Sequence, residues 1–305
     1  FEGLNFSGFM YPLDVLPENL GMLVKYLRDD DTFLGGSIAV PYKTDIIQHL
    51  DDIDSEAKAI GAVNCIYRDQ NKKLVGTNTD GAGALWSLQS NYGNINGANI
   101  LILGAGGAAA AVAVYLGRAI GSNGKIYISN RTQKKTDQLI QRLSNICSVS
   151  SLTWPLSIDK THKIDIILNC TSIGFDSTIK DQKGFYSLKF YTPIGKIKED
   201  IRVSQLENLE REYVSKASKY ITENFFETNN FLCQHKKLLI FDIVYQPELT
   251  PLLFISNLIG HKILSGSGMN LEQAVIAFDK ATSAIGERKP NQNEVRKYMV
   301  DILKN

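Results

Sequence analysis

The chain has 305 residues, and its 33 basic and 32 acidic side chains leave a formal net charge of +1. This length favours two domains over a single small core. The even charge gives no attractive field for DNA, RNA or an anionic membrane surface, so neither a nucleic acid nor a membrane is expected as a partner.

The cysteines and histidines give no sign of a metal site or a disulfide framework. The four cysteines are widely scattered and form no CxxC pair, and the four histidines make no ligand-spaced cluster with them. We therefore expect a cytoplasmic protein with reduced thiols and no structural metal. The sequence shows no signal peptide, and because it begins at Phe1 rather than Met, we expect a further segment before it.

The first part of the chain alternates helical and strand-like patterns. The spacing of apolar residues predicts helices over 16–27 and 44–50, and strands over 35–40, 62–67 and 73–76. No internal repeat interrupts this order.

From residue 99 the pattern changes to apolar strands separated by helical stretches. Strands are expected at 99–103, 125–129, 164–170 and 238–244, which is the βαβ rhythm of a parallel sheet. The uncharged stretch 98–117 is long enough for a membrane span. Its central glycines instead favour a buried strand followed by a helix.

The segment 188–236 breaks the βαβ rhythm and is rich in charged and amide side chains. Helical spacing within 204–226 predicts one helix there. We expect an insertion that buries little apolar area and packs on the domain of this parallel sheet, away from any functional cleft. Two more helices are predicted at 269–284 and 294–303.

A glycine turn follows the strand at 99–103, with the sequence Gly104-Ala105-Gly106-Gly107-Ala108. Gly104 allows a tight turn, Gly106 lets the backbone approach phosphate oxygens, and the start of the next helix supplies free N–H groups. These features predict a dinucleotide pyrophosphate site, and the alternative is a loop that only caps a helix.

The end of the next strand indicates which dinucleotide binds. NAD sites usually place Asp or Glu there, whereas this chain has Asn130-Arg131-Thr132, with Lys134 and Lys135 close behind. Arg131 suits a ribose 2′-phosphate, so NADP is favoured over NAD. The alternative is a solvated basic helix start.

Further motifs, in order and spacing, resemble the shikimate dehydrogenase family over nearly the whole chain apart from the insertion. They are Val40-Pro41-Tyr42-Lys43, Ala59-Ile60-Gly61-Ala62-Val63-Asn64, Asn78-Thr79-Asp80-Gly81, the glycine turn, Asn130-Arg131-Thr132, Asn169-Cys170-Thr171-Ser172-Ile173-Gly174, Asp242-Ile243-Val244-Tyr245 with Thr250-Pro251, and Gly268-Met269 with Gln273.

The resemblance implies an α/β fold of two domains. Residues 1–87 with 265–305 would form a substrate domain completed by C-terminal helices, and residues 88–264 would form a Rossmann NADP-binding domain. The implied reaction is the reversible, NADP-dependent oxidation of shikimate to 3-dehydroshikimate in aromatic amino acid biosynthesis.

The resemblance also implies roles for individual residues. Lys43 matches the family's catalytic lysine and Asp80 its partner aspartate, and such a pair can hydrogen-bond a reacting hydroxyl and pass its proton. Taken alone, Lys43 reads as an ordinary solvent-facing lysine and Asp80 as a turn or cap residue.

Other side chains match the family's binding positions. Asn64 and Gln273 correspond to amides that hydrogen-bond substrate hydroxyls, and Tyr245 to a tyrosine near the substrate carboxylate, although a buried aromatic at a strand end explains Tyr245 equally well. Thr171 and Gly268 join the glycine turn, Asn130, Arg131, Thr132 and Lys135 as implied cofactor-binding residues.

Two departures from the family pattern leave the substrate open. Ala39 stands where the family usually has a threonine whose hydroxyl contacts the substrate, and the family's early Ser-x-Ser loop has no match, since Ser7 is a poor substitute. One alternative is therefore a paralogue acting on quinate, an aminoshikimate or a related hydroxylated acid. Another is a non-catalytic NADP-sensing protein. A homodimer and a place in a larger multifunctional polypeptide are also left open.

Overall fold

The computed structural model describes residue 4 and residues 8–156, 163–198, 200–205, 207, 209–284 and 290–303. Ser7 lies outside these described residues. The chain divides into two compact units. Unit 1 consists of Phe1–Ser87, Ala110–Tyr115 and Gly268–Asn305, and unit 2 consists of Leu88–Ala109 and Leu116–Ser267.

Unit 1 is built on a four-stranded sheet in the order β1 (Gly35–Ser37), β3 (Cys65–Arg68), β4 (Leu74–Thr77) and β2 (Asp52–Ile53). Strands β1, β3 and β4 are antiparallel, and β2 runs parallel to β4. The short 3₁₀ helix η2 (Pro17–Asn19) leads into α1 (Leu20–Asp29), and a second, η3 (Asp45–His49), follows β1.

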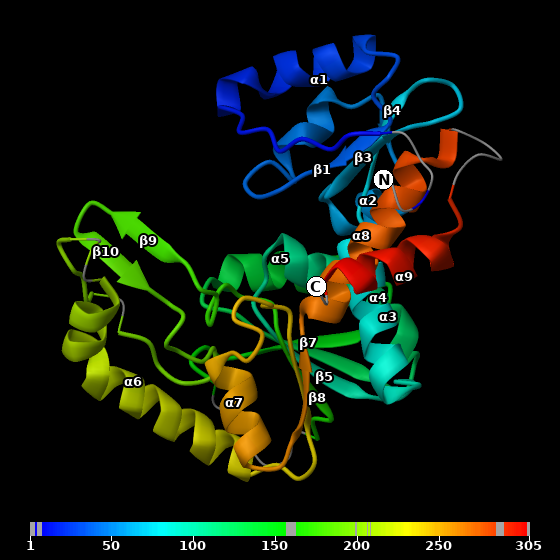
Figure 1. Ribbon diagram of the computed structural model, residues 1–305. Coiled ribbons are helices and arrows are strands. Elements are labelled where there is room, and N and C mark those ends of the chain that lie inside the picture. The colour runs from blue at the N-terminus through cyan, green and yellow to red at the C-terminus, as the bar shows by residue number, and fades with distance from the viewer. Residues whose placement is uncertain are drawn as a thin grey trace. The chain divides into compact units, whose positions relative to one another are not determined.

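The core of unit 1 lies between this sheet and its helices (Figure 1). The amphipathic pattern of α1 places Leu20 and Val24 inward, where they pack with Ile46 of η3 and with Ile66 and Leu74 of the sheet. These side chains are almost completely buried. The regularly spaced apolar side chains of the first 80 residues therefore pack into one shared core.

Arg68 ties the end of α1 to β3. Its buried guanidinium donates to the carbonyl oxygens of Leu27 (2.7 Å), Asp30 (2.9 Å), Phe33 (3.1 Å) and Lys72 (2.8 Å). The last carbonyls of a helix lack partners within the helix, and a buried cation near them is favourable. This single side chain therefore stabilises the helix end and the loop that follows it.

Further helices contribute to unit 1. Helix α2 (Ser55–Ile60) is capped by Asp54, whose side chain accepts from the N–H of Ala57. The start of α3 (Asp80–Tyr92), residues 110–115, α8 (Ser267–Ala281) and α9 (Gln292–Leu303) also belong to the unit. Helices α8 and α9 cover the two helices predicted near the C-terminus.

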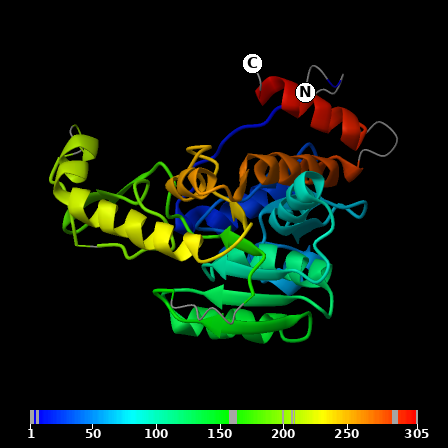
Figure 2. The same cartoon turned by 90° about the horizontal axis from the view of Figure 1, so that it is seen from below.

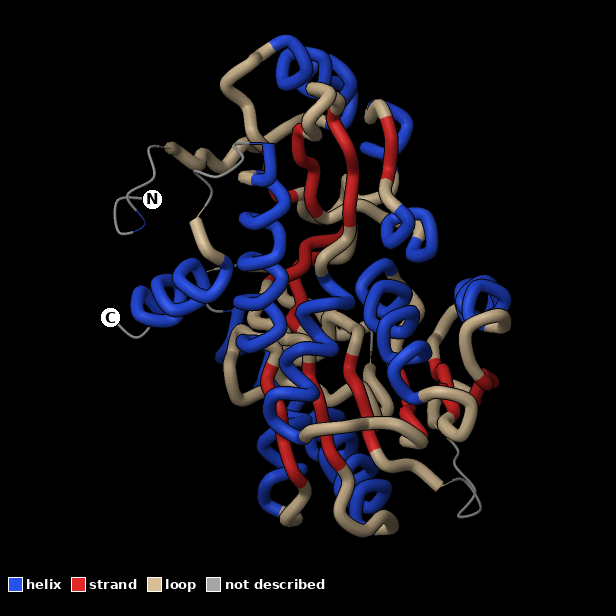
Figure 3. Tube along the Cα trace, turned by 90° about the vertical axis from the view of Figure 1, so that its right-hand side faces the viewer, coloured by secondary structure: helices blue, strands red, loops and turns tan. Residues whose placement is uncertain are grey.

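Unit 2 contains a six-stranded parallel sheet (Figure 3). Its order is β12 (Lys262–Ser265), β11 (Leu239–Asp242), β8 (Ile166–Asn169), β5 (Asn99–Leu103), β6 (Lys125–Ser129) and β7 (Ser148–Leu152). Helices α4 (Gly107–Ile120), α5 (Gln133–Leu143) and α7 (Pro251–Leu258) connect the strands. Counted along the chain from β5, this is the 3-2-1-4-5-6 order of a Rossmann sheet, so the predicted α/β class is confirmed.

The uncharged stretch 98–117 forms the central strand β5 and the first part of α4. Within the part of the chain that the structure describes, no helix combines the length and apolar character needed to cross a membrane. The continuous apolar run reflects burial of β5, since a central strand of a parallel sheet is covered on both faces.

The insertion is more apolar inside than its composition indicates. It includes the long helix α6 (Leu209–Cys233), which lies beside the hairpin of β9 (Thr178–Asp181) and β10 (Gly184–Ser187) in Figures 1 and 2. The buried members of its core are Ile173, Tyr191, Val203, Leu209, Tyr213 and Ala217.

The expectation that the insertion buries little apolar area is therefore wrong. Its apolar side chains are sparse, but the spacing along α6 places Leu209, Tyr213 and Ala217 on one face. Ile194 and Leu232 also pack into the hydrophobic core that the parallel sheet forms with its helices. The whole segment belongs to unit 2.

Candidate active site

Lys43 and Asp80 form an ion pair in unit 1. Lys43 lies in the turn between β1 and η3, and Asp80 is the first residue of α3. The Nζ of Lys43 donates to Oδ2 of Asp80 across 2.6 Å, and their side chains are 23% and 11% exposed. The pair is thus shielded from most of the solvent and still accessible to a small molecule.

Backbone hydrogen bonds hold Lys43 in place. The segment from β1 to Lys43 runs beside residues 62–64, where the N–H of Val63 donates to the carbonyl of Lys43 (2.7 Å) and the N–H of Ile38 donates to the carbonyl of Asn64 (2.7 Å). Pro41 lacks an N–H and cannot extend a ladder, which agrees with β1 ending at Ser37 rather than at 40 as predicted.

Asn64 connects Asp80 to its neighbours. Its buried amide donates to Oδ1 of Asp80 (2.7 Å) and to Oγ1 of Thr79 (3.0 Å), and its oxygen accepts from the N–H of Thr79 (2.8 Å). Asn78 fixes the start of α3 from the other side, because its Oδ1 accepts from the N–H of Asp80 (3.1 Å). Both oxygens of the Asp80 carboxylate therefore have a defined donor.

Gln273 reaches this network from α8, more than 190 residues further along the chain. Its Oε1 accepts from Nδ2 of Asn64 (3.3 Å), and its carbonyl accepts from Oγ1 of Thr79 (3.0 Å). Gly83 makes this approach possible, since a Cβ there would lie 2.7 Å from the carbonyl of Met269 and 2.9 Å from the nitrogen of Gln273. The close contact of α3 with α8 thus depends on a glycine.

The structure therefore brings four of the predicted residues together: Lys43, Asn64, Asp80 and Gln273. They supply one cation, one carboxylate and two amides that both donate and accept hydrogen bonds. This set can bind several hydroxyl groups and exchange a proton with one of them.

The glycine turn of unit 2 has the geometry of a phosphate-binding loop. Gly104 has a φ of +107°, and a Cβ on it would lie 3.0 Å from the carbonyl of Cys170. A Cβ on Gly106 would meet no atom of the described residues within 4 Å, so the space beside this backbone is open. Gly106 is the N-cap of α4 and provides no side-chain acceptor for the first N–H groups of that helix, where Gly107 and Ala108 lie.

A basic cluster lies at the start of α5. Arg131, Lys134 and Lys135 are exposed there, the first turn of α5 has no acidic residue, and Asn130 donates to the carbonyl of the N-cap residue Thr132 (3.0 Å). Cations at a helix N-terminus oppose the helix dipole. A bound anion would offset this unfavourable arrangement.

Three predicted residues lie outside the Lys43 network, the glycine turn itself and the basic cluster. Thr171, in the loop after β8, contacts the Gly104 turn, because a Cβ on Gly104 would lie 3.1 Å from its Cγ2. Tyr245 follows β11 in unit 2 and is 38% exposed. It is therefore not the buried aromatic residue that the alternative explanation required. Gly268 belongs to unit 1, where a Cβ would lie 2.7 Å from Oγ of Ser87, so close packing of α8 on α3 accounts for this glycine.

Sequence reasoning assigned no role to several buried polar residues that organise both sites. Asn78 accepts from the N–H of Asp80, Thr79 donates to Asn64, and Asn169 and Asp242 link the loops at the carboxyl edge of the parallel sheet. Each lies within one of the family-like motifs, at most three positions from a predicted site residue. Polar residues at the ends of apolar strands were the signal that could have found them.

The described residues contain no group of three His, Cys, Asp or Glu side chains able to hold a metal ion. All four cysteines are free. Burial raises the pKa of Cys65 to about 12 and holds the pKa of Cys170 well above its usual value, so both thiols stay protonated and unreactive.

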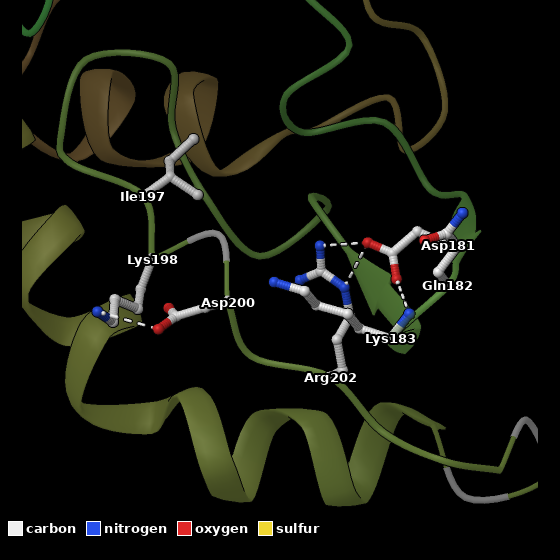
Figure 4. A pocket seen from close by; sticks show the side chains of 7 residues that line it. All are labelled: Asp181, Gln182, Lys183, Ile197, Lys198, Asp200 and Arg202. Atoms are coloured by element: carbon white, nitrogen blue, oxygen red, sulfur yellow. Dashed lines mark hydrogen bonds and ion pairs between the residues drawn. The ribbon is translucent and has the colours of Figure 1, made fainter.

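A separate pocket is lined by the end of β9, the turn that follows it and the early part of the insertion, and it contains none of the predicted site residues (Figure 4). Four of the charged side chains that line it form two ion pairs. Arg202 donates to Oδ2 of Asp181 (2.7 Å), and Lys198 lies 3.2 Å from Asp200. This arrangement indicates a structural role for these four charges.

A Rossmann sheet with a glycine turn, together with a unit that holds a Lys–Asp pair, is the arrangement of a nucleotide-dependent oxidoreductase. Comparison with known proteins identifies the family. The family profile described as the shikimate dehydrogenase substrate binding domain matches residues 1–66, and that of shikimate / quinate 5-dehydrogenase matches residues 87–177.

Relatives agree with these profiles. The shikimate dehydrogenase (NADP(+)) of Methanocaldococcus jannaschii is 29% identical over 309 residues, covering 99% of this chain and 88% of the relative. That of Pyrobaculum aerophilum is 34% identical over 202 residues, covering 65% of this chain and 72% of the relative. A crystal structure of shikimate dehydrogenase in complex with NADP+ has a TM-score of 0.66 and 27% identity, covering 96% of this chain and 84% of that one. The chain belongs to the shikimate dehydrogenase family, and the predicted membership is confirmed.

Proposed function

We propose that this chain catalyses the reversible, NADP-dependent oxidation of shikimate to 3-dehydroshikimate, a step of aromatic amino acid biosynthesis. The observation that carries the proposal is the Lys43–Asp80 pair, 2.6 Å apart and bonded through Asn64 to Gln273. The relatives that match nearly the whole chain are named as enzymes of this reaction, which supports the same assignment.

The cofactor site fits NADP on its own geometry. The open backbone at Gly106 and the free N–H groups at the start of α4 suit a pyrophosphate, and Arg131 with Lys135 suits a 2′-phosphate. When bound, NADP+ supplies the ring that accepts a hydride from the substrate carbon. The remaining tasks fall to side chains of this chain.

Lys43 is proposed to handle the proton. In the oxidation direction the O–H bond of the reacting hydroxyl breaks, and its proton passes to the neutral amine of Lys43 as the C–H bond releases its hydride. In the reverse direction the ammonium returns the proton to the new alkoxide. Asp80 holds Nζ at 2.6 Å and stabilises the ammonium form by its charge.

Asn64 and Gln273 are proposed to orient the ring. Each amide both donates and accepts, so each matches a hydroxyl that does the same. Because Asn64 also bonds Asp80, a hydroxyl held by the amides lies in a fixed relation to the proton-transfer pair. Tyr245 is proposed as a contact for the substrate carboxylate, and Gly268 as part of the cofactor site.

Quinate or an aminoshikimate is the second candidate substrate, and Ala39 is the observation that favours it. Ala39 is exposed on the segment that leads to Lys43 and carries no hydroxyl to donate to a ligand. Losing one neutral hydrogen bond costs about 0.5 to 1.5 kcal/mol, which is enough to change the preference between similar hydroxylated acids.

The test is an assay in which the full-length protein is incubated with NADP+ and either shikimate, quinate or no substrate. The formation of NADPH is measured by its absorbance. Shikimate is expected to give the higher kcat/KM. A higher value for quinate would assign the paralogue function. No turnover with any hydroxylated acid, together with retained NADP binding, would support a non-catalytic NADP sensor.

A cytoplasmic location is also proposed, supported by four free cysteines. A homodimer and a place in a larger multifunctional polypeptide remain predictions. Light scattering on the purified protein and immunoblotting of the natural source for its full size test them.

A further inference from the structure

Three neighbouring strands of the parallel sheet end in one row at its carboxyl edge. The register pairs Leu103 of β5 with Asn169 of β8, and Asn169 with Asp242 of β11. Asn169 and Asp242 are completely buried. Two completely buried polar side chains thus lie side by side, directly next to the strand that leads into the glycine turn.

Every polar atom of these two side chains has a partner. The amide nitrogen of Asn169 donates to Oδ1 of Asp242 (2.9 Å) and to the carbonyl of Ile173 (3.0 Å), and its oxygen accepts from both the N–H (3.0 Å) and the hydroxyl (2.7 Å) of Thr171. Asn169 therefore sets the conformation of the loop that begins at Thr171.

Asp242 performs the same task on the next loop. Its Oδ1 accepts from the N–H of Val244 (3.0 Å), and its Oδ2 accepts from the hydroxyl of Thr250 (2.7 Å). Thr250 in turn caps α7, because its Oγ1 accepts from the N–H of Leu253 (3.3 Å). One carboxylate thus joins the end of β11 to the start of α7.

The linked loops lie against the glycine turn. A Cβ on Gly104 would lie 3.0 Å from the carbonyl of Cys170 and 3.1 Å from Cγ2 of Thr171, so the turn after β5 rests on the loop that Asn169 holds. A shift of Thr171 would therefore change the space available to the Gly104 turn.

We infer that Asn169 and Asp242 are positioning residues that fix the loops after β8 and β11 against the glycine turn and so preserve the NADP site. Both residues belong to unit 2, whereas the Lys43 network belongs to unit 1, so we assign them no part in the proton transfer. The inference rests on the proposed function, since it assumes that the turn at Gly104 binds NADP. Their loss weakens cofactor binding and leaves the affinity for the hydroxylated acid unchanged.

The test compares two buried asparagines of unit 2. Asn224, in α6, is also completely buried, and it holds Thr192 and Lys196 through three hydrogen bonds of 2.9 to 3.2 Å within the insertion. Asn169→Ala and Asn224→Ala both remove a buried amide and both lower thermal stability. Asn169→Ala is expected to raise the Kd for NADP about tenfold, and Asn224→Ala less than about twofold.

The Kd is measured by titrating the full chain with NADPH and following its fluorescence, and the KM for shikimate is measured at saturating NADP+. Equal Kd values for the parent and Asn169→Ala would overturn the inference and leave the proposed function intact. A parent protein that binds no NADPH would instead overturn the proposed function. A rise in the shikimate KM equal to the rise in Kd would show a general loss of structure and contradict positioning.

Thr250→Val serves if Asn169→Ala fails to fold. Valine has nearly the same shape and removes the bond to Oδ2 of Asp242, whereas Thr250→Ser retains the hydroxyl. The valine variant is expected to weaken NADP binding several-fold, and the serine variant to restore it. Parental affinity in the valine variant would refute the inference.

Discussion

The Nζ of Lys43 lies 2.6 Å from Oδ2 of Asp80, although the two residues are 37 positions apart in the chain. If they transfer the proton, Lys43→Ala lowers kcat by about 10² to 10⁴, the usual range for a general acid–base group. The Kd for NADP stays near that of the parent, because the glycine turn belongs to unit 2. Steady-state kinetics with the preferred substrate and NADPH titration measure both quantities.

Lys58→Ala is the matched control, since Lys58 is an exposed lysine of unit 1 that pairs with exposed Asp52. It is expected to leave kcat unchanged. A loss of less than about tenfold for Lys43→Ala would refute the catalytic assignment.

Asp80→Asn keeps the shape of the side chain and removes its charge. The loss of a charge next to Nζ of Lys43 is expected to lower kcat and to change the pH profile of kcat, while Asn64 retains an acceptor at Oδ1. Rate measurements across pH for the parent and the variant check this. Identical profiles would show that Asp80 only begins α3.

Arg131→Ala is expected to remove most of the preference for NADP over NAD. A charge-assisted contact to the 2′-phosphate is worth about 1.5 to 3 kcal/mol, and NAD lacks that phosphate. The ratio of kcat/KM for the two cofactors measures the effect. Arg142→Ala, at the other end of α5, is the control, and equal efficiencies with both cofactors in the parent would contradict the prediction.

The stability of unit 2 is expected to depend on pH through Asp242. Complete burial raises the pKa of this carboxyl to about 7 against the opposing hydrogen bonds from Thr250, Val244 and Asn169. The folded state then holds a proton that the unfolded chain has lost, so the free energy of unfolding falls as pH rises from about 4 to about 7. Each unit of pKa difference corresponds to about 1.4 kcal/mol.

Hydrogen exchange of the β8 and β11 amides, read at several pH values and corrected for intrinsic exchange rates, reports this stability locally. Asp242→Asn cannot titrate, so its stability relative to the parent is expected to rise across this pH range. A constant difference between the two proteins would show that the carboxyl has no raised pKa.

Arg296 of α9 binds both oxygens of Glu272 of α8, at 2.8 and 2.7 Å, and the Glu272 side chain is 3% exposed. Arg296→Ala leaves a buried carboxylate without this partner and is expected to cost about 3 to 5 kcal/mol of stability in unit 1. The double replacement of both residues by leucine is expected to recover part of the loss. Denaturant unfolding of the parent, Arg296→Ala and the double variant measures these free energies. An equal loss of stability for Lys58→Ala would contradict the prediction.

The sequence alone determined the central strands of the Rossmann sheet and the position of its glycine turn. Strands β5 and β6 coincide with the predicted ranges 99–103 and 125–129, because central strands are long, apolar and followed by glycine or polar caps. The edge strands β7 and β12 were not predicted. They are half-exposed and mix polar with apolar residues, so they give no clear periodicity.

The insertion shows the limit of composition as a guide. Its charge and amide content correctly indicated a departure from the βαβ rhythm, and the helix predicted at 204–226 corresponds to α6, although residues 206 and 208 lie outside the described part of the chain. Its core around Tyr191 and Tyr213 depends on which side chains face inward. That choice is made by packing against the β9–β10 hairpin.

The motifs of the sequence determined which residue types the site contains, and only the tertiary structure decided which of them meet. Lys43 and Asp80 were paired through a family resemblance, whereas the contact of Gln273 with Asn64 depends on α8 approaching α3 at Gly83. The link between Asn169 and Asp242 likewise follows from strand order. Sequence spacing records local periodicity, but contacts between distant segments are set by the packing of whole elements, which no local pattern encodes.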